Sequence, residues 1–191
     1  MLLEHMKVQY GQFFTPASLA ERVVCGLRLP GAGALRMLDL GAGAGALTAA
    51  VARLLPEGMN LQVTCVEVDA DLLPHLGRTL AGLDHEIIHG DALSLAARGM
   101  LREDHDVVVM NPPYGKLAAS SEERRAMAQL GVDVPNIYAA FMAIGYLHLR
   151  RGADGRHRAA FLDERSLFQT VPGAHARPRQ PGPDSGLRLP V

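Results

Sequence analysis

A short tetrad in the middle of the chain, Asn111-Pro112-Pro113-Tyr114, carries groups suited to holding an exocyclic amino group. Asn111 offers a side-chain carbonyl, Pro112 offers a backbone carbonyl, and Pro113 stiffens the loop that holds them. Two fixed acceptors can receive both hydrogens of one amino group and aim its nitrogen lone pair at an electrophile. The Tyr114 ring can stack on the ring that carries the amino group. A strand that ends in a Pro-Pro turn with a surface tyrosine is the alternative interpretation.

The residues just before the tetrad, 106–110, predict the element that positions it. After Asp106 this run is apolar, with three β-branched valines at 107–109, which is typical of a strand buried on both faces of a parallel sheet. The two prolines cannot donate to a strand ladder, so the strand must end there. In an open α/β sheet, ligands bind just beyond the carboxyl ends of strands, and we expect the tetrad at that place.

A second candidate site is the glycine-rich run 41–45, between a predicted strand at 34–40 and a predicted helix at 46–55. Gly41 and Gly43 would let a ligand approach the backbone closely, and Asp39 at the strand end can accept a hydrogen bond from an amine or a hydroxyl. No Lys-Ser/Thr pair follows the glycines, so a phosphate-gripping P-loop is not expected. A tight strand-to-helix turn without a ligand is the alternative.

Two further acids, Glu67 and Asp91, lie near the carboxyl ends of predicted strands at 62–69 and 86–93. An acid at the end of the second strand commonly binds the hydroxyls of a ribose. A single acid at a strand end more often caps a helix. The carboxyl ends of parallel strands meet at one edge of the sheet, so Asp39, Glu67 and Asp91 together indicate one shared ligand site.

The N-terminal stretch contains Phe13-Phe14-Thr15-Pro16 before a predicted helix that runs to about residue 28. Thr15 is a good N-cap and Pro16 a good first helical residue, so a capped surface helix explains the pattern by itself. The functional alternative is that the two phenylalanines and Thr15 close over a ligand.

The alternation of strands and helices predicts a doubly wound, Rossmann-like α/β fold in one domain. The composition, 48% hydrophobic and 20% charged over 191 residues, is ordinary for a globular protein. Cys25 and Cys65 have no neighbours at metal-ligand spacing, so no metal site is expected. The chain shows no signal peptide and no apolar run of about 18 residues, so we expect a cytoplasmic protein without membrane contact.

Taken in order, these motifs resemble those of N6-adenine DNA methyltransferases. The resemblance covers about residues 9–150 and is strongest to the group that includes type I modification subunits and fused type II restriction–modification enzymes. In that group a Phe-Thr-Pro signature precedes the glycine loop, as it does here at residues 14–16. The segment 136–141 also resembles the helix that follows the catalytic loop of the group.

The resemblance implies S-adenosylmethionine as cofactor and DNA, with an adenine flipped out of the duplex, as substrate. It implies catalytic roles for Asn111, Pro112, Pro113 and Tyr114. It also implies a cofactor-binding set, in which Glu67 holds the ribose and Asp91 the adenine amino group, while Thr15 and Asp39 face the methionine end. The full set is Phe14, Thr15, Asp39, Gly41, Gly43, Glu67, Asp91 and Ala92.

The sequence departs from this family after about Arg151. Residues 1–150 carry 12 basic and 16 acidic side chains, whereas residues 151–191 carry 7 and 4, and prolines replace apolar periodicity. We expect a methyltransferase domain at 1–150 and an irregular or disordered tail at 151–191, with one strand near 158–162. The abrupt change predicts a truncated or out-of-frame C-terminus, with DNA recognition left to a missing domain or to a specificity subunit.

The predicted function is therefore methylation of the N6 amino group of adenine in DNA, in a restriction–modification context. A methyltransferase that acts on an RNA base or on a protein glutamine amide shares the tetrad and is the first alternative. The second alternative is an inactive remnant that binds the cofactor without turnover.

Overall fold

The computed structural model describes residues 15–27, 29, 33–113, 115–150 and the backbone of 158–161. Two of the predicted site residues, Phe14 and Tyr114, lie outside the described residues. Most of the predicted tail at 151–191 also lies outside the described residues, and the prediction that it is out of frame stays a prediction.

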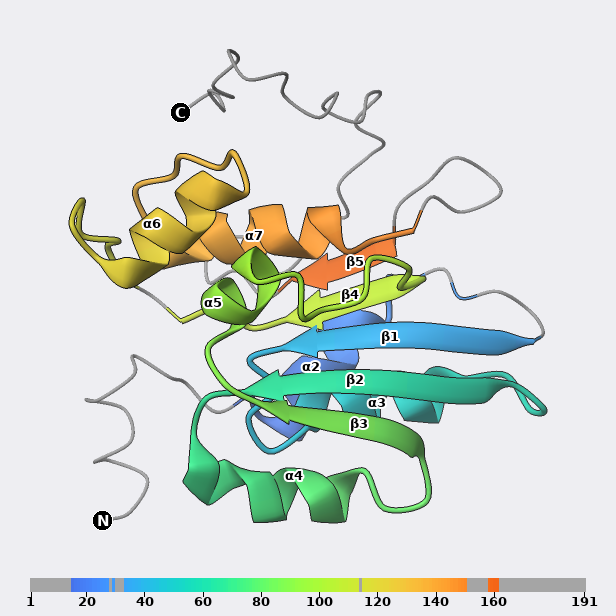
Figure 1. Ribbon diagram of the computed structural model, residues 1–191. Helices are drawn as coiled ribbons and strands as arrows, with labels where there is room; N and C mark the ends of the chain where they lie inside the picture. The colour runs from blue at the N-terminus through green and yellow to red at the C-terminus, as the bar shows by residue number, and fades with distance from the viewer. Residues whose placement is uncertain (1–14, 28, 30–32, 114, 151–157, 162–191) are drawn as a thin grey trace.

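Five parallel strands form one sheet in the order β3-β2-β1-β4-β5 (Figure 1). The strands are β1 (Ala34–Leu40), β2 (Asn60–Glu67), β3 (Asp84–His89), β4 (Val107–Met110) and β5 (Arg158–Phe161). The strand order reverses between β1 and β4, which is the switch point at which such sheets bind ligands. This confirms the predicted doubly wound α/β fold.

Helices cover both faces of the sheet (Figure 1). One face packs against α2 (Ala17–Val24), α3 (Ala46–Leu54) and α4 (Leu73–Thr79), which follows a 3-10 turn at Ala70–Leu72. The other face packs against α5 (Ala92–Ala97), α6 (Glu122–Gln129) and α7 (Ile137–Leu147). Side chains alternate along β1, because successive residues of a strand point to opposite faces of the sheet. Met37 packs in the core on the side of α2, α3 and α4, and Leu38 packs in the core on the side of α5, α6 and α7.

The sequence prediction placed some ends wrongly. The third strand ends at His89, not at residue 93, because the Asp91 side chain accepts a hydrogen bond from the Ser94 N–H and begins α5 (2.8 Å). The first helix is also shorter than predicted and ends at Val24.

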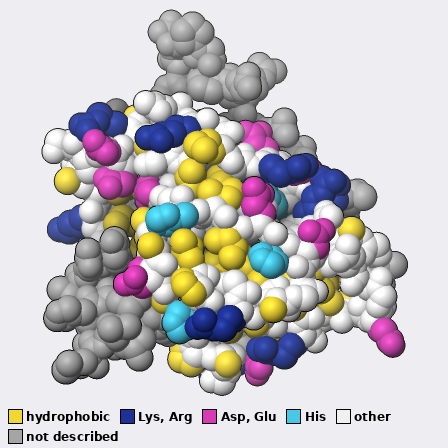
Figure 2. All heavy atoms as spheres, turned by 60° about the horizontal axis from the view of Figure 1, so that its bottom comes forward, with side chains coloured by type: hydrophobic (Ala, Val, Ile, Leu, Met, Phe, Trp, Pro, Cys, Tyr) yellow, Lys and Arg dark blue, Asp and Glu magenta, His cyan; other side chains and the backbone are white. Residues whose placement is uncertain are grey.

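The strand expected near residue 158 is present as β5, which pairs with β4 and extends the core sheet. The domain boundary at residue 150 stays a prediction, since most of the chain after it lies outside the described residues. Within those residues, no helix combines the length and the apolar character that a bilayer span requires. On the face shown in Figure 2, basic and acidic side chains are interspersed.

Gly145 lies where α7 crosses β4, and a Cβ at this position would overlap Met110 Cε and approach Val108 Cγ1 to 3.3 Å. Gly77 in α4 has no described atom within 4 Å of the corresponding position. We expect Gly77→Ala to raise the free energy of unfolding by about 0.5–1 kcal/mol, through helix propensity alone. Gly145→Ala should lower it, because overpacking costs about 1–3 kcal/mol. Urea unfolding of both variants tests this, and equal stabilisation would contradict the described packing of α7.

Candidate functional site

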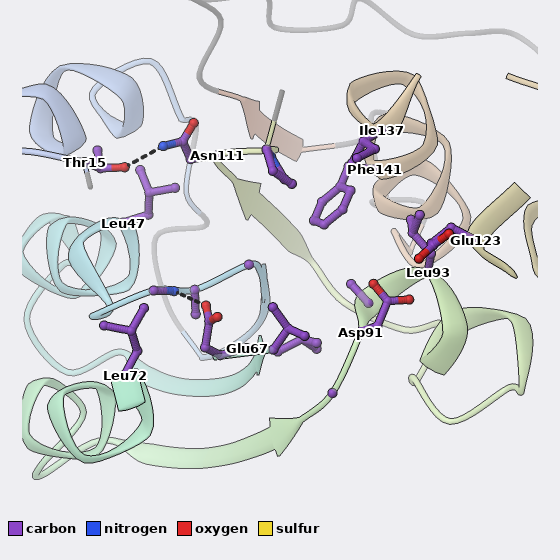
Figure 3. A pocket seen from close by; sticks show the side chains of 18 of the residues that line it. Thr15, Leu47, Glu67, Leu72, Asp91, Leu93, Asn111, Glu123, Ile137 and Phe141 are labelled. Atoms are coloured by element: carbon purple, nitrogen blue, oxygen red, sulfur yellow. Dashed lines mark hydrogen bonds between the residues drawn. The ribbon is translucent and has the colours of Figure 1, made fainter. Parts of the chain in front are cut away.

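A pocket of about 590 Å³ opens at the carboxyl ends of β1, β2 and β4 (Figure 3). Its walls come from the glycine turn, the end of β2, the start of α5, Asn111 and Pro113 of the tetrad, and α7. Eight of the predicted site residues line it together: Thr15, Gly41, Gly43, Glu67, Asp91, Ala92, Asn111 and Pro113. Asp39 and Pro112 are buried and are not among the lining residues.

The register of the sheet explains why these residues meet. Leu40 on β1 pairs with Met110 on β4, so Gly41 and Asn111 leave neighbouring strands at the same level. The glycine turn and the start of the tetrad therefore form adjacent parts of one wall, although about 70 residues of chain separate them.

The glycine turn requires glycine for its backbone shape. Gly41, Gly43 and Gly45 have φ angles of 71°, 58° and 85°, in the left-handed region that other L-residues rarely adopt. The N–H groups of Gly41 and Ala42 both donate to the Val66 carbonyl oxygen at 2.9 Å. The turn is thereby held against the end of β2, and it presents backbone instead of side chains to the pocket.

Glu67 fixes the same turn through its side chain. Its Oε2 accepts from the Gly43 N–H at 2.6 Å, and its Oε1 accepts from the Asp69 N–H at 2.8 Å. The residue is only 1% exposed, so these charge-assisted hydrogen bonds replace much of the hydration that burial removes. The carboxylate lies in the middle of the pocket wall in Figure 3. Each carboxylate oxygen has more than one lone pair, so this position is compatible with accepting from a ligand hydroxyl as well.

Asp39 lies beneath the turn instead of in the pocket. Its Oδ2 accepts from the Thr48 hydroxyl at 2.6 Å, which ties β1 to α3. Its Oδ1 is buried and has no hydrogen-bond partner among the described residues. Burial raises the pKa of Asp39 to about 7, and the nearby Glu67 charge contributes to the rise, while the Thr48 hydrogen bond opposes it. The predicted contact of Asp39 with the cofactor stays a prediction.

Asn111 is held by Thr15, which lies beside it at one end of the pocket. Its Nδ2 donates to the Thr15 Oγ at 3.0 Å, and both side chains line the pocket (Figure 3). At the other end of the pocket, Asp91 caps α5 and also forms part of the wall. Its position therefore agrees with the helix-cap interpretation and leaves the ligand-binding one open.

Several lining residues were not predicted as site residues. Ile137 and Phe141 come from α7, Leu47 and Leu72 from the opposite helical layer, and Glu123 from α6. The spacing of Ile137 and Phe141, four residues apart, does indicate one helix face. No local signal directs that face to the pocket, because the contact arises from the packing of α7 on the sheet.

Comparison with protein families gives a direct assignment. Residues 27–129 match the model of the methyltransferase small domain. The chain belongs to this family. S-adenosylmethionine is the cofactor of this type of domain.

Two curated relatives extend across most of this chain. Type II methyltransferase M.BsuBI of Bacillus subtilis is 32% identical over 155 residues, which is 72% of this chain and 31% of the relative. Type II methyltransferase M.PstI of Providencia stuartii is 27% identical over 168 residues, which is 79% of this chain and 33% of the relative. The chain thus spans about a third of the length of these relatives.

A shorter match and a solved structure complete the comparison. Ribosomal RNA small subunit methyltransferase C of Stutzerimonas stutzeri is 36% identical over 88 residues, 45% of this chain and 23% of the relative. The methyltransferase subunit of a type I restriction–modification system from Streptococcus thermophilus superimposes with a TM-score of 0.55 at 22% identity. That match covers 78% of this chain and 34% of the subunit, and it shows that the two share a fold.

The residues of the pocket fit this cofactor. S-Adenosylmethionine carries a sulfonium cation, two ribose hydroxyls and an adenine ring. The pocket offers the carboxylates of Glu67, Asp91 and Glu123 as acceptors, and apolar side chains such as Phe141 for the ring. Lys116 is the only basic residue among those that line it in the described part of the chain.

The raised pKa of Asp39 predicts a pH-dependent stability. Because the pKa rises from 3.8 to about 7 in the folded chain, the protonated carboxyl contributes stability that is complete below about pH 4 and is lost as the pH rises through 7. The Asp39→Asn side chain cannot ionise. Between about pH 5 and pH 8 we therefore expect the free energy of unfolding of this variant to rise by about 1–3 kcal/mol relative to that of the parent. Urea unfolding at a series of pH values measures this, with the exposed Glu57→Gln as control. If the free energies of unfolding of Asp39→Asn and the parent changed with pH in the same way, the raised pKa of Asp39 would be refuted.

The hydrogen bonds of Glu67 predict its effect on cofactor affinity. Glu67→Ala leaves the Gly43 and Asp69 N–H groups without their acceptor and loosens the turn, so binding of S-adenosylhomocysteine should weaken by about 1–3 kcal/mol. Calorimetry measures the affinity, and the melting temperature of the free variant shows whether it is folded. Glu57→Ala, an exposed change away from the pocket, should bind like the parent. Unchanged affinity in a folded Glu67→Ala variant would remove Glu67 from the site.

Proposed function

We propose that this domain transfers a methyl group from S-adenosylmethionine to the N6 amino group of adenine in DNA, as the catalytic core of a restriction–modification methylase. The observation that carries the proposal is the position of Asn111 and Pro113, in the same pocket wall as the glycine turn of the cofactor site. The names of the two type II relatives, which share 27–32% identity with most of this chain, support it.

In this proposal the cofactor lies along the pocket. Glu67 accepts from the ribose hydroxyls, and Asp91, with Ala92 beside it, holds the adenine amino group at the start of α5. Gly41 and Gly43 let the cofactor approach the backbone, and Thr15 lies at the methionine end, with Phe14 before it in sequence. Figure 3 supports this order, since Thr15 and Asp91 lie at opposite ends of the pocket with Glu67 between them.

The target adenine approaches from the side of the tetrad. The Asn111 side-chain carbonyl and the Pro112 backbone carbonyl accept the two amino hydrogens, and Tyr114 stacks on the flipped base. The nitrogen gains the methyl group as the carbon–sulfur bond breaks, and the product loses a proton to water. No general base is required, because the chain contributes mainly by holding the amino nitrogen in line with the methyl group and the sulfur.

DNA is the proposed partner of the whole protein. In this proposal a separate recognition domain or a specificity subunit selects the sequence, because the described residues build the sheet, its helical layers and the cofactor pocket. Lys116, an exposed pocket residue two positions after Tyr114, suits a phosphate next to the flipped nucleotide.

A second candidate substrate is an RNA base, which the match to a ribosomal RNA methyltransferase favours. A protein glutamine amide presents the same kind of amino group to the tetrad. Labelled cofactor offered with duplex DNA, ribosomal RNA or a release factor distinguishes the three substrates. Transfer to RNA or protein alone would refute the DNA proposal, and no transfer to any of them would favour an inactive cofactor-binding domain.

The role of Asn111 gives a direct prediction. If its carbonyl holds the target amino group, Asn111→Ala should lower turnover on the order of 10²-fold, by analogy with the loss of one preorganised polar contact. Calorimetry with S-adenosylhomocysteine should show nearly unchanged affinity. Asn60→Ala, an exposed change at the start of β2, is the matched control and should keep parental turnover. An Asn111→Ala variant as active as the parent would overturn the mechanism.

A further inference from the structure

A hydrogen bond joins Thr15, before α2, to Asn111, the first residue of the tetrad. Thr15 precedes α2 and Asn111 follows β4, 96 positions later, yet the Asn111 Nδ2 lies 3.0 Å from the Thr15 Oγ (Figure 3). Both residues are partly buried and line the pocket. The bond therefore lies inside the candidate active site and joins two of its separate walls.

The Asn111 amide has two ends of similar size and opposite chemistry. Its oxygen only accepts hydrogen bonds, and its NH₂ group only donates them. A half-turn about the Cβ–Cγ bond exchanges the two ends at almost no steric cost. An amide with its NH₂ toward the substrate would present donors to an amino group that also donates, so only one of the two orientations can hold the target.

We propose that Thr15 is a positioning residue that selects the productive orientation of Asn111. The Thr15 hydroxyl accepts from Nδ2, and this turns Oδ1 toward the place where the target amino group binds. A hydroxyl has one donor and two acceptor sites, so it can hold Nδ2 and still donate to another acceptor in the pocket. The inference rests on the proposed function, because it concerns the group that receives the methyl.

An Asn111→Asp background separates orientation from other effects of Thr15. A carboxylate has two equivalent acceptor oxygens, so in this variant a half-turn of the side chain at position 111 changes nothing and no orienting partner is needed. Thr15→Val removes the hydroxyl with little change of shape, and Thr15→Ser keeps it. The substrate is a DNA duplex with an adenine opposite an abasic site, which lowers the cost of flipping.

With the parent Asn111, we expect Thr15→Val to lower kcat about tenfold or more, and Thr15→Ser to restore it to within about threefold of the parent. In the Asn111→Asp background, with S-adenosylmethionine at saturation, Thr15→Val should lower kcat by a several-fold smaller factor than in the parent, since the pair no longer acts as a unit. Equal losses of kcat in both backgrounds would overturn the positioning role. So would a Thr15→Val variant with parental kcat.

A second measurement does not depend on turnover. In the ¹⁵N-labelled chain bound to S-adenosylhomocysteine, the Asn111 side-chain NH₂ resonances are identified by their loss in Asn111→Asp. Their exchange with solvent should be slow in the parent and in Thr15→Ser, and several-fold faster in Thr15→Val, because a hydrogen bond protects the donor. Equal exchange in the parent and Thr15→Val would refute the orienting contact.

The two measurements also separate this inference from the proposed function. If the parent methylates the DNA and Asn111→Ala does not, a Thr15→Val variant with parental kcat shows that only the positioning role is wrong. If the parent transfers no methyl group to DNA, the proposed function is wrong, and the exchange rates alone decide whether Thr15 orients the amide.

Discussion

The geometry of the pocket depends on one buried carboxylate. Glu67 is almost without solvent contact, and its two oxygens accept from the backbone N–H groups of Gly43 and Asp69. A buried charge without such donors would cost several kcal/mol. The turn after β1 and the chain after β2 are therefore fixed to each other through a single side chain. Because both segments line the pocket or adjoin it, this contact sets the wall against which the rest of the site is built.

The parallel sheet then brings together the two parts of the site on which the proposed methyl transfer depends. The β1–β4 register places the glycine turn next to Asn111, at the point where the strand order reverses. A methyl transfer between a bound cofactor and a held amino group needs alignment more than it needs a strong base. A rigid sheet edge, with one loop stiffened by prolines and another held by Glu67, suits that requirement.

Glu67 in the pocket wall and Asp39 beneath the turn are neighbouring carboxylates with different physical roles. Glu67 is stabilised by backbone donors, whereas Asp39 accepts from the Thr48 hydroxyl, and burial raises the pKa of Asp39 to about 7. Cys65 lies next to Thr48, and burial likewise raises the pKa of its thiol. Burial therefore favours the uncharged forms of Asp39 and Cys65 beneath the turn. The acidic groups that line the pocket itself are the ones available to a cationic cofactor.

The sequence by itself determined the features that depend on local chemistry. The apolar run before the tetrad predicted β4, the glycines predicted the tight turn, and the strand-end acids predicted a shared edge. Only the tertiary structure decided which of these groups meet. Asp39 turns to Thr48 on α3 and leaves the pocket wall, Asp91 caps α5, and Thr15 reaches Asn111 across 96 positions. These outcomes depend on how helices pack on the sheet. Local periodicity predicts helices and strands, but it does not predict contacts between segments that are distant in the sequence.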